Sequence, residues 1–143
     1  MSFEEKGTWV VTVIAVTTAA VYFAMILSQL PTTAVGDIDY QVPLLTAIGA
    51  TIGLSIAASI GVAILSSIVS GEDASKSDVR DRDINRLGEY VGGIVVTFGM
   101  IVPLGLALSE APHFWIANAM YLIFVVSGLS AAVVKLVIYR RGF

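Results

Sequence analysis

The chain has 143 residues, of which 57% are hydrophobic and 13% are charged, and its mean hydropathy is +0.88. An ordinary soluble domain carries about 25% charged residues, so the composition indicates a membrane protein. The sequence has no cysteine and one histidine, which excludes disulfides, thiolate zinc sites, thiol redox chemistry and bis-histidine haem. The net charge of −3 argues against a protein that binds nucleic acid.

Four apolar segments follow in chain order, at about residues 9–30, 42–69, 90–108 and 114–138. Each is long enough to cross a hydrocarbon core, which takes about 20 helical residues. The only Asp, Glu, Lys or Arg inside them is Lys135, whose long stem can reach the interface. The segments are apolar all round, whereas helices of a soluble bundle keep a polar face. We therefore predict an all-α integral membrane four-helix bundle, formed by one domain over residues 1–143.

The basic residues predict the orientation of the spans. All eight fall on the side that holds both termini and the linker at residues 70–88: Lys6, Lys76, Arg80, Arg82, Arg86, Lys135, Arg140 and Arg141. The loops on the other side, at residues 31–41 and 109–113, contain none. Because Lys and Arg are retained in the cytoplasm, we expect both termini to be cytoplasmic. The first span is too long for the apolar region of a cleavable signal, so we expect a retained, multi-pass protein of a plasma membrane, most simply a bacterial one.

The chain aligns with itself at one informative offset. Shifted by 81 residues, the segment at 7–31 matches the segment at 88–112 without a gap, and Gly7, Ser28 and Pro31 meet Gly88, Ser109 and Pro112. Shifted by 75 residues, Gly-Leu-Ser at 53–55 meets Gly-Leu-Ser at 128–130. The pattern predicts two tandem two-span hairpins. An even number of spans relates them by a pseudo-twofold axis along the membrane normal.

The second span carries small side chains at every fourth residue: Gly49, Gly53, Ala57 and Gly61. Small residues at this spacing let helix backbones approach closely, which is how spans associate in lipid. Three interpretations stay open at this point. The stripe packs inside one bundle, forms the interface of a homodimer, or lets a ligand approach the backbone.

The third span contains Pro103, which lacks an N–H group and clashes with the carbonyl four residues earlier, that of Gly99. A kink is expected there. It is either simple curvature of the helix, or a hinge or solute path to which Asn118 of the fourth span contributes. The polar residues inside the spans are otherwise hydroxyls and amides. Proton-coupled exporters need an intramembrane carboxylate, so this mechanism is disfavoured, and no catalytic constellation is visible.

The linker at 70–88 is the most distinctive polar stretch. Its candidate docking residues for a cytoplasmic partner are Asp78, Arg80, Asp81, Arg82, Asp83 and Arg86. Ser77 or Asp78 can cap a helix, and Asp–Arg pairs three or four residues apart can form ion pairs along it. The alternatives are therefore a salt-bridged juxtamembrane helix or a docking surface. A metal site on the three aspartates is disfavoured because the arginines oppose a cation.

The two loops on the other side hold weaker candidates. His113 is interpreted as a helix-start residue at the interface. The alternative is a pH sensor, or one ligand of an intersubunit metal site together with Glu110. Asp37 and Asp39 make the first loop acidic, which could concentrate cations.

Several stretches together resemble a group of short four-span membrane proteins of actinobacterial type. They are the opening Met-Ser-Phe-Glu-Glu-Lys-Gly-Thr-Trp-Val, the central Asp78-Val-Arg-Asp-Arg-Asp-Ile, Gly88-Glu-Tyr-Val-Gly, His113-Phe-Trp-Ile-Ala-Asn-Ala-Met-Tyr, and the terminal Tyr-Arg-Arg-Gly-Phe. In that group the central motif is Asp-Glu-Arg-Asp, and here Val79 replaces the glutamate. The group has no assigned activity, so the resemblance implies an integral membrane protein and no catalytic residues.

These observations favour a protein that is not an enzyme, with no cofactor, no metal and no nucleic-acid partner. We expect an accessory or regulatory membrane protein that acts through its cytoplasmic linker as a homo-oligomer, with a dimer favoured. The alternative is a small channel or carrier for an ion or solute, using Pro103 and Asn118.

Overall fold

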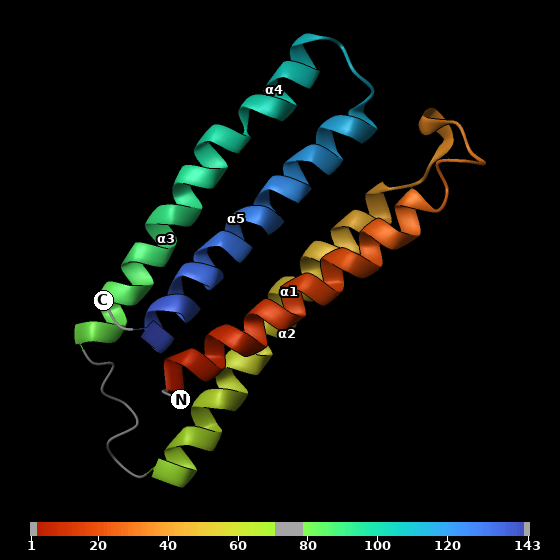
Figure 1. Ribbon diagram of the computed structural model, residues 1–143. Coiled ribbons are helices and arrows are strands. Elements are labelled where there is room, and N and C mark those ends of the chain that lie inside the picture. Colours follow the sequence, from red (N-terminus) through yellow and green to blue (C-terminus); the bar gives the residue numbers. More distant parts are fainter. Residues whose placement is uncertain (1–2, 71–78, 142–143) are drawn as a thin grey trace.

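The computed structural model describes residues 3–70 and 79–141 and is helical over most of them (Figure 1). The helices are α1 (Phe3–Leu27), the 3-10 helix η1 (Val35–Asp37), α2 (Gln41–Ser70), α3 (Val79–Gly99), α4 (Ile101–Leu108) and α5 (His113–Arg141). Within these residues four helical segments are long and apolar enough to cross a membrane: Glu5–Leu27, Gln41–Leu65, Val79–Leu108 and His113–Arg141. The prediction of an all-helical protein with four segments long and apolar enough to span a membrane is confirmed.

Several hydroxyl side chains inside the spans bond to their own helices. Thr12 donates to the carbonyl of Thr8 at 2.6 Å, and Thr46 donates to that of Val42 at 2.8 Å. A buried hydroxyl without a partner is costly in lipid, and the carbonyl one turn back supplies one locally. These threonines are therefore compatible with a lipid-facing helix and need no polar site around them.

The helices are arranged in a row rather than in a closed bundle. α1 packs against α2 and α5, and α5 packs against α3 and α4, whereas α2 packs extensively only against α1. A twofold axis along the membrane normal would exchange α1 with α3 and α2 with α5. The contact between α1 and α5 would then have a counterpart between α2 and α3, and the described helices form no such extensive contact.

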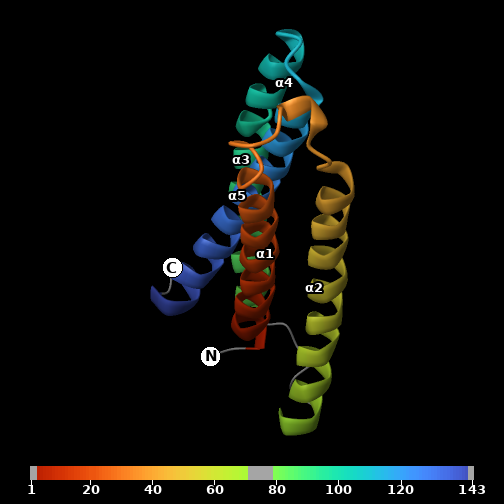
Figure 2. The same cartoon turned by 90° about the vertical axis from the view of Figure 1, so that its right-hand side faces the viewer.

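The start of α1 and the end of α5 lie at the same end of the helices, which we call the termini end (Figure 1). The opposite loop end holds η1 and the turn between α4 and α5. Figure 2 shows that α2 and α5 diverge from the loop end toward the termini end, with α1 between them. The helix row is therefore most open where the chain begins and ends.

The buried core is concentrated toward the loop end. Tyr22 and Ile26 of α1 are each 1% exposed, and Tyr22 meets Tyr121 of α5 edge-on at 5.2 Å between ring centroids. Ile38, from the loop after η1, is buried in the same cluster, and Tyr40 meets Phe114 at 5.3 Å. Aromatic pairs in this geometry add to the stabilisation from burial. They hold the first loop against the start of α5.

Three glycines of α3 allow the close packing of α3 on α5. A Cβ atom at Gly88 would lie 3.0 Å from the Ala131 carbonyl oxygen, and one at Gly92 would lie 3.2 Å from that of Ser127. A Cβ atom at Gly99 would meet Ile123 at 2.7 Å. The Ser127 hydroxyl also donates to the Gly92 carbonyl at 2.9 Å. The glycines bring the two backbones close enough for this interhelical hydrogen bond.

The third span is interrupted four residues before its proline. α3 ends at Gly99 and α4 begins at Ile101, which is where the missing N–H of Pro103 leaves a carbonyl without its helical partner. The helix is thus interrupted at the place where a kink is expected. Pro103 itself is buried.

The third helix begins earlier than the span predicted from about residue 90. α3 starts at Val79 and continues into the membrane segment, so the second half of the linker is helical. Ile84 is fully buried at 0% exposed, while Val79 is 72% exposed. This anchored residue fixes the linker helix to the rest of the molecule.

The turn between α4 and α5 uses one residue in a left-handed conformation. Glu110 has φ 56°, and its N–H donates to the Ala107 carbonyl at 3.1 Å while that of Ala111 donates to the Leu106 carbonyl at 3.0 Å. This is the Schellman pattern of helix termination, in which glycine usually occupies that position. The strain at Glu110 thus has a structural reason.

Candidate functional site

A polar contact inside the helix row engages Asn118. The Tyr22 hydroxyl donates to Asn118 Oδ1 at 2.7 Å, and Asn118 Nδ2 donates to the Phe114 carbonyl at 2.8 Å. Asn118 is 8% exposed, and both ends of its amide are engaged. Buried polar groups bonded in this way tie helices together. The structure places Asn118 in the contact between α1 and α5.

A second polar contact joins α1 to α2. The Thr18 and Thr51 hydroxyl oxygens lie 2.6 Å apart, and Tyr121 of α5 interacts with the Thr51 side chain. The two contacts together link three helices near the loop end. Thr18, Thr51 and Tyr121 are hydroxyl residues like others in the spans. No local pattern in the sequence predicts that they pair across the fold.

The small-residue stripe of α2 lies on the exposed side of the helix. A Cβ atom at Gly49, Gly53 or Gly61 would meet nothing within 4 Å, and Ala57 is exposed. The face of α2 that meets α1 includes Ala47, which is 9% exposed. Packing inside one bundle is therefore wrong for these glycines, because no helix of the described residues approaches them.

The start of α3 presents three arginines to the surroundings. Arg80, Arg82 and Arg86 are exposed, and none forms an ion pair with a carboxylate of the described residues. Asp83 stands three residues from both Arg80 and Arg86, a spacing that allows an ion pair, and the described residues form neither pair. Asp83 is exposed and Asp81 is half-buried in the first turn, where the helix dipole favours an anion.

The remaining predicted residues are spread over the fold. Asp78 lies outside the described residues, so its capping role stays a prediction. His113 is the first residue of α5 and is exposed, and Glu110 is exposed in the turn before it. Within the described residues, no three His, Cys, Asp or Glu side chains are grouped where they could hold a metal ion.

Two hollows lie end to end along α1, between α2 and α5. The hollow nearer the loop end has a volume of about 540 Å³, and its walls include Ile52 of α2 and Phe124 of α5. The second, of about 590 Å³, includes Lys135 of α5. Ala15 and Gly128 line both hollows. We call the two together the α1 groove.

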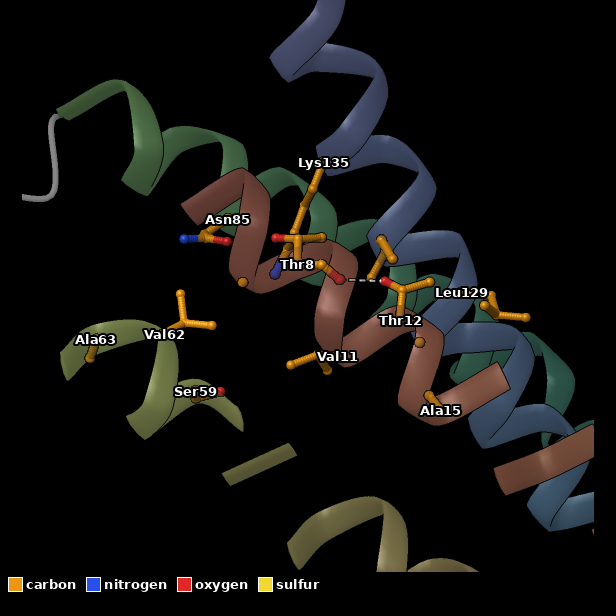
Figure 3. A pocket seen from close by; sticks show the side chains of 14 residues that line it. Thr8, Val11, Thr12, Ala15, Ser59, Val62, Ala63, Asn85, Leu129 and Lys135 are labelled. Atoms are coloured by element: carbon orange, nitrogen blue, oxygen red, sulfur yellow. Dashed lines mark hydrogen bonds between the residues drawn. The ribbon is translucent and has the colours of Figure 1, made fainter. Parts of the chain in front are cut away.

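One end of the α1 groove is polar and the remainder is apolar. Figure 3 shows the side chains of Lys135, Asn85 and Thr8 gathered at one end of the second hollow, with Ala15 at the other. The Lys135 stem runs over Gly88, where a Cβ atom would lie 2.6 Å from Lys135 Cε. Gly88 thus leaves the room that the lysine needs to reach the groove.

Sequence reasoning missed two parts of this arrangement. Gly88 and Gly92 are four residues apart, a spacing that favours close helix packing but that the open glycines of α2 share. The α1 groove had no such signal, because it depends on how far α2 and α5 diverge. Neither Pro103 nor Asn118 lines the groove.

Comparison with known protein families, curated proteins and solved structures finds no match to this chain.

Proposed function

We propose that the protein is a non-enzymatic accessory or regulatory membrane protein that recruits a cytoplasmic partner through the start of α3. The observation that carries this proposal is the set of three exposed arginines without ion pairs in the described part of the chain. Arginine side chains bind carboxylates through paired hydrogen bonds. Since Ile84 is buried beside them, the arginines stand on an anchored helix and suit an acidic protein surface.

The cytoplasmic location of this surface is part of the proposal. It is supported by the positions of the basic residues, all at the termini end or in the linker, and by loop-end segments that contain none. The chain has no cysteine, so single cysteines report cleanly on sidedness. We expect a membrane-impermeant maleimide to label Gly36→Cys in intact cells and to label Arg141→Cys only after lysis. The reverse pattern would contradict the orientation.

We further propose a homodimer formed through Gly49, Gly53, Ala57 and Gly61. Its support is that these positions lie on α2, which packs extensively only against α1, and that the three glycines have open space around them. Small residues gain contacts when a second helix lies close to them, whereas lipid chains fill such a surface less well. A dimer would also bury part of the most exposed helix of the row.

The tandem hairpins also stay a proposal. They are supported by the internal match of residues 7–31 with 88–112 and by the pairing of α1 with α2 and of α3 with α5. The two copies differ in one clear respect. Gly88 is buried against α5, while Gly7 has open space where its Cβ would be.

Photocrosslinking in cells tests the recruitment proposal. A photoreactive amino acid at Val79, which is 72% exposed on the same helix, should give one adduct of defined protein mass. The triple substitution Arg80→Gln, Arg82→Gln and Arg86→Gln should reduce that adduct to background while the unfolding midpoint stays the same. An adduct that persists in the triple variant, or an adduct only to lipid, would contradict the proposal. Arg141→Gln is the matched control.

The alternative prediction of a channel or carrier has its own assay. Purified protein in liposomes should then carry ion or solute flux that Pro103→Ala or Asn118→Leu alters. Absence of flux above that of empty liposomes would exclude this alternative.

A further inference from the structure

We propose that the α1 groove binds one anionic phospholipid, with its phosphate at Lys135 and an acyl chain along α1 toward Phe124. This inference does not rest on the recruitment of a partner. It rests on three features of the groove: a cation without a counterion among the described residues, a second polar group beside it, and an apolar continuation at the depth of the spans.

The cation is the first feature. Lys135 lies six residues before the last residue of α5, which is about 9 Å along a helix axis. No carboxylate of the described residues pairs with its ammonium group. Glu5, the acidic residue at the start of α1, does not line the groove. A charged group at this depth is costly unless an anion or water meets it.

The second feature is the polar neighbourhood of Lys135. The Asn85 amide lines the same end of the groove and has no hydrogen-bonding partner among the described residues. The Thr8 side chain lies there as well (Figure 3). An ammonium and an amide together offer donors to the oxygens of one phosphate group. They converge at the termini end, where the headgroups of one leaflet would lie.

The third feature is the apolar continuation. Beyond Ala15 and Gly128, the walls are formed mostly by aliphatic and aromatic side chains of α2 and α5, including Leu44, Ile48, Met120 and Val125. An acyl chain matches such a surface. A polar solute would lose its hydrogen bonds along it.

The same features disfavour a second copy of the chain as the occupant. A helix inserted into the groove would have to place a carboxylate near Lys135. The apolar segments at residues 9–30, 42–69, 90–108 and 114–138 contain no Asp or Glu, so none of these segments provides this partner. A phospholipid supplies the negative charge and the chain together.

Native mass spectrometry tests the proposal on the whole purified protein. The protein in mild detergent is incubated with equal amounts of phosphatidylglycerol and phosphatidylcholine that carry identical acyl chains. We expect one retained phosphatidylglycerol per chain. In Lys135→Gln the preference for phosphatidylglycerol should fall about fivefold, the effect of one basic residue near an anionic surface.

Filling the groove tests the chain-binding part. Gly128 lines both hollows, and a Cβ atom there meets nothing within 4 Å. Leucine in Gly128→Leu therefore enters the groove, and we expect it to abolish retention of both lipids. The matched control is Gly93→Leu, at an exposed glycine that does not line the groove and has equally open surroundings. Arg141→Gln is the control for loss of one cation. Both controls should retain lipid as the unmodified protein does.

Equal retention of the two lipids by the unmodified protein would overturn the proposal. An unchanged preference for phosphatidylglycerol in Lys135→Gln, or an equal loss of lipid retention in either control, would also overturn it. A dimer that retains no lipid and in which the second chain covers Gly128 would do the same. Unfolding midpoints are recorded for every variant. Lys135→Gln alone decides the question if Gly128→Leu does not fold.

Discussion

Helices α2 and α3 both carry small residues about one helical turn apart, but the two sets have different surroundings. On α3, Cβ atoms at Gly88, Gly92 and Gly99 would come within 3.2 Å of atoms of α5. On α2, Cβ atoms at Gly49 and Gly53 would meet nothing within 4 Å. The same sequence pattern is thus a helix–helix contact in one hairpin and an open surface in the other.

The difference shows that the facing helix decides whether glycines are packed. Opposite Gly92, α5 offers Ala131 and the Ser127 hydroxyl, which donates to the Gly92 carbonyl at 2.9 Å. Lipid is as apolar as the spans, so the hydrophobic effect does not select the face that becomes buried. Close contacts and interhelical hydrogen bonds select it instead. On α2 the contact with α1 instead includes Thr51, bonded to Thr18. The glycine face is left outside.

The largest effect should come from a large side chain on the packed stripe. We expect Gly92→Leu to reduce the free energy of unfolding by about 3 kcal/mol, because overpacking at Ser127 and Ala131 forces α3 away from α5. Denaturant unfolding in detergent micelles, followed by helical circular dichroism, measures the change. Stability equal to that of the unmodified protein would mean that α3 and α5 are not in close contact.

A smaller effect should come from the polar contact between α1 and α5. Tyr22→Phe removes the donor to Asn118 Oδ1, and we expect a loss of about 1 kcal/mol, as for other hydrogen bonds between membrane helices. Thr46→Val is the control, since the Thr46 hydroxyl bonds only within α2. That variant should change stability by less than about 0.5 kcal/mol. Equal losses in the two variants would show that the contact across helices adds nothing.

Hydropathy and charge were sufficient to predict the number of spans, because about 20 apolar residues suffice to cross the hydrocarbon core. They did not predict which helix faces are packed, since spans that are apolar all round have no polar face to mark the outside. The proline at 103 predicted its own helix break because the cause is local. Tyr22 and Asn118 pair across 96 positions of sequence, which no local pattern indicates.

The candidate site shows the same difference between local features, which the sequence predicts, and contacts across the fold, which it does not. The sequence predicted a helical, charged linker, and α3 does begin at Val79. Its Asp–Arg spacing also allows ion pairs of Asp83, which do not form in the described residues, because exposed side chains gain little from a pair in water. The α1 groove depends on the divergence of whole helices and lay beyond sequence reasoning.

The most direct test of the contrast between α2 and α3 is the free energy of unfolding of Gly53→Leu in the same micelles. At a protein-to-detergent ratio at which the chain is monomeric, so that loss of the proposed dimer does not contribute, we predict that it stays within about 0.5 kcal/mol of the unmodified protein or rises slightly, because leucine meets open space and favours a helix more than glycine does. A loss comparable to that of Gly92→Leu would contradict the account, since it would show that Gly53 is packed within the folded chain.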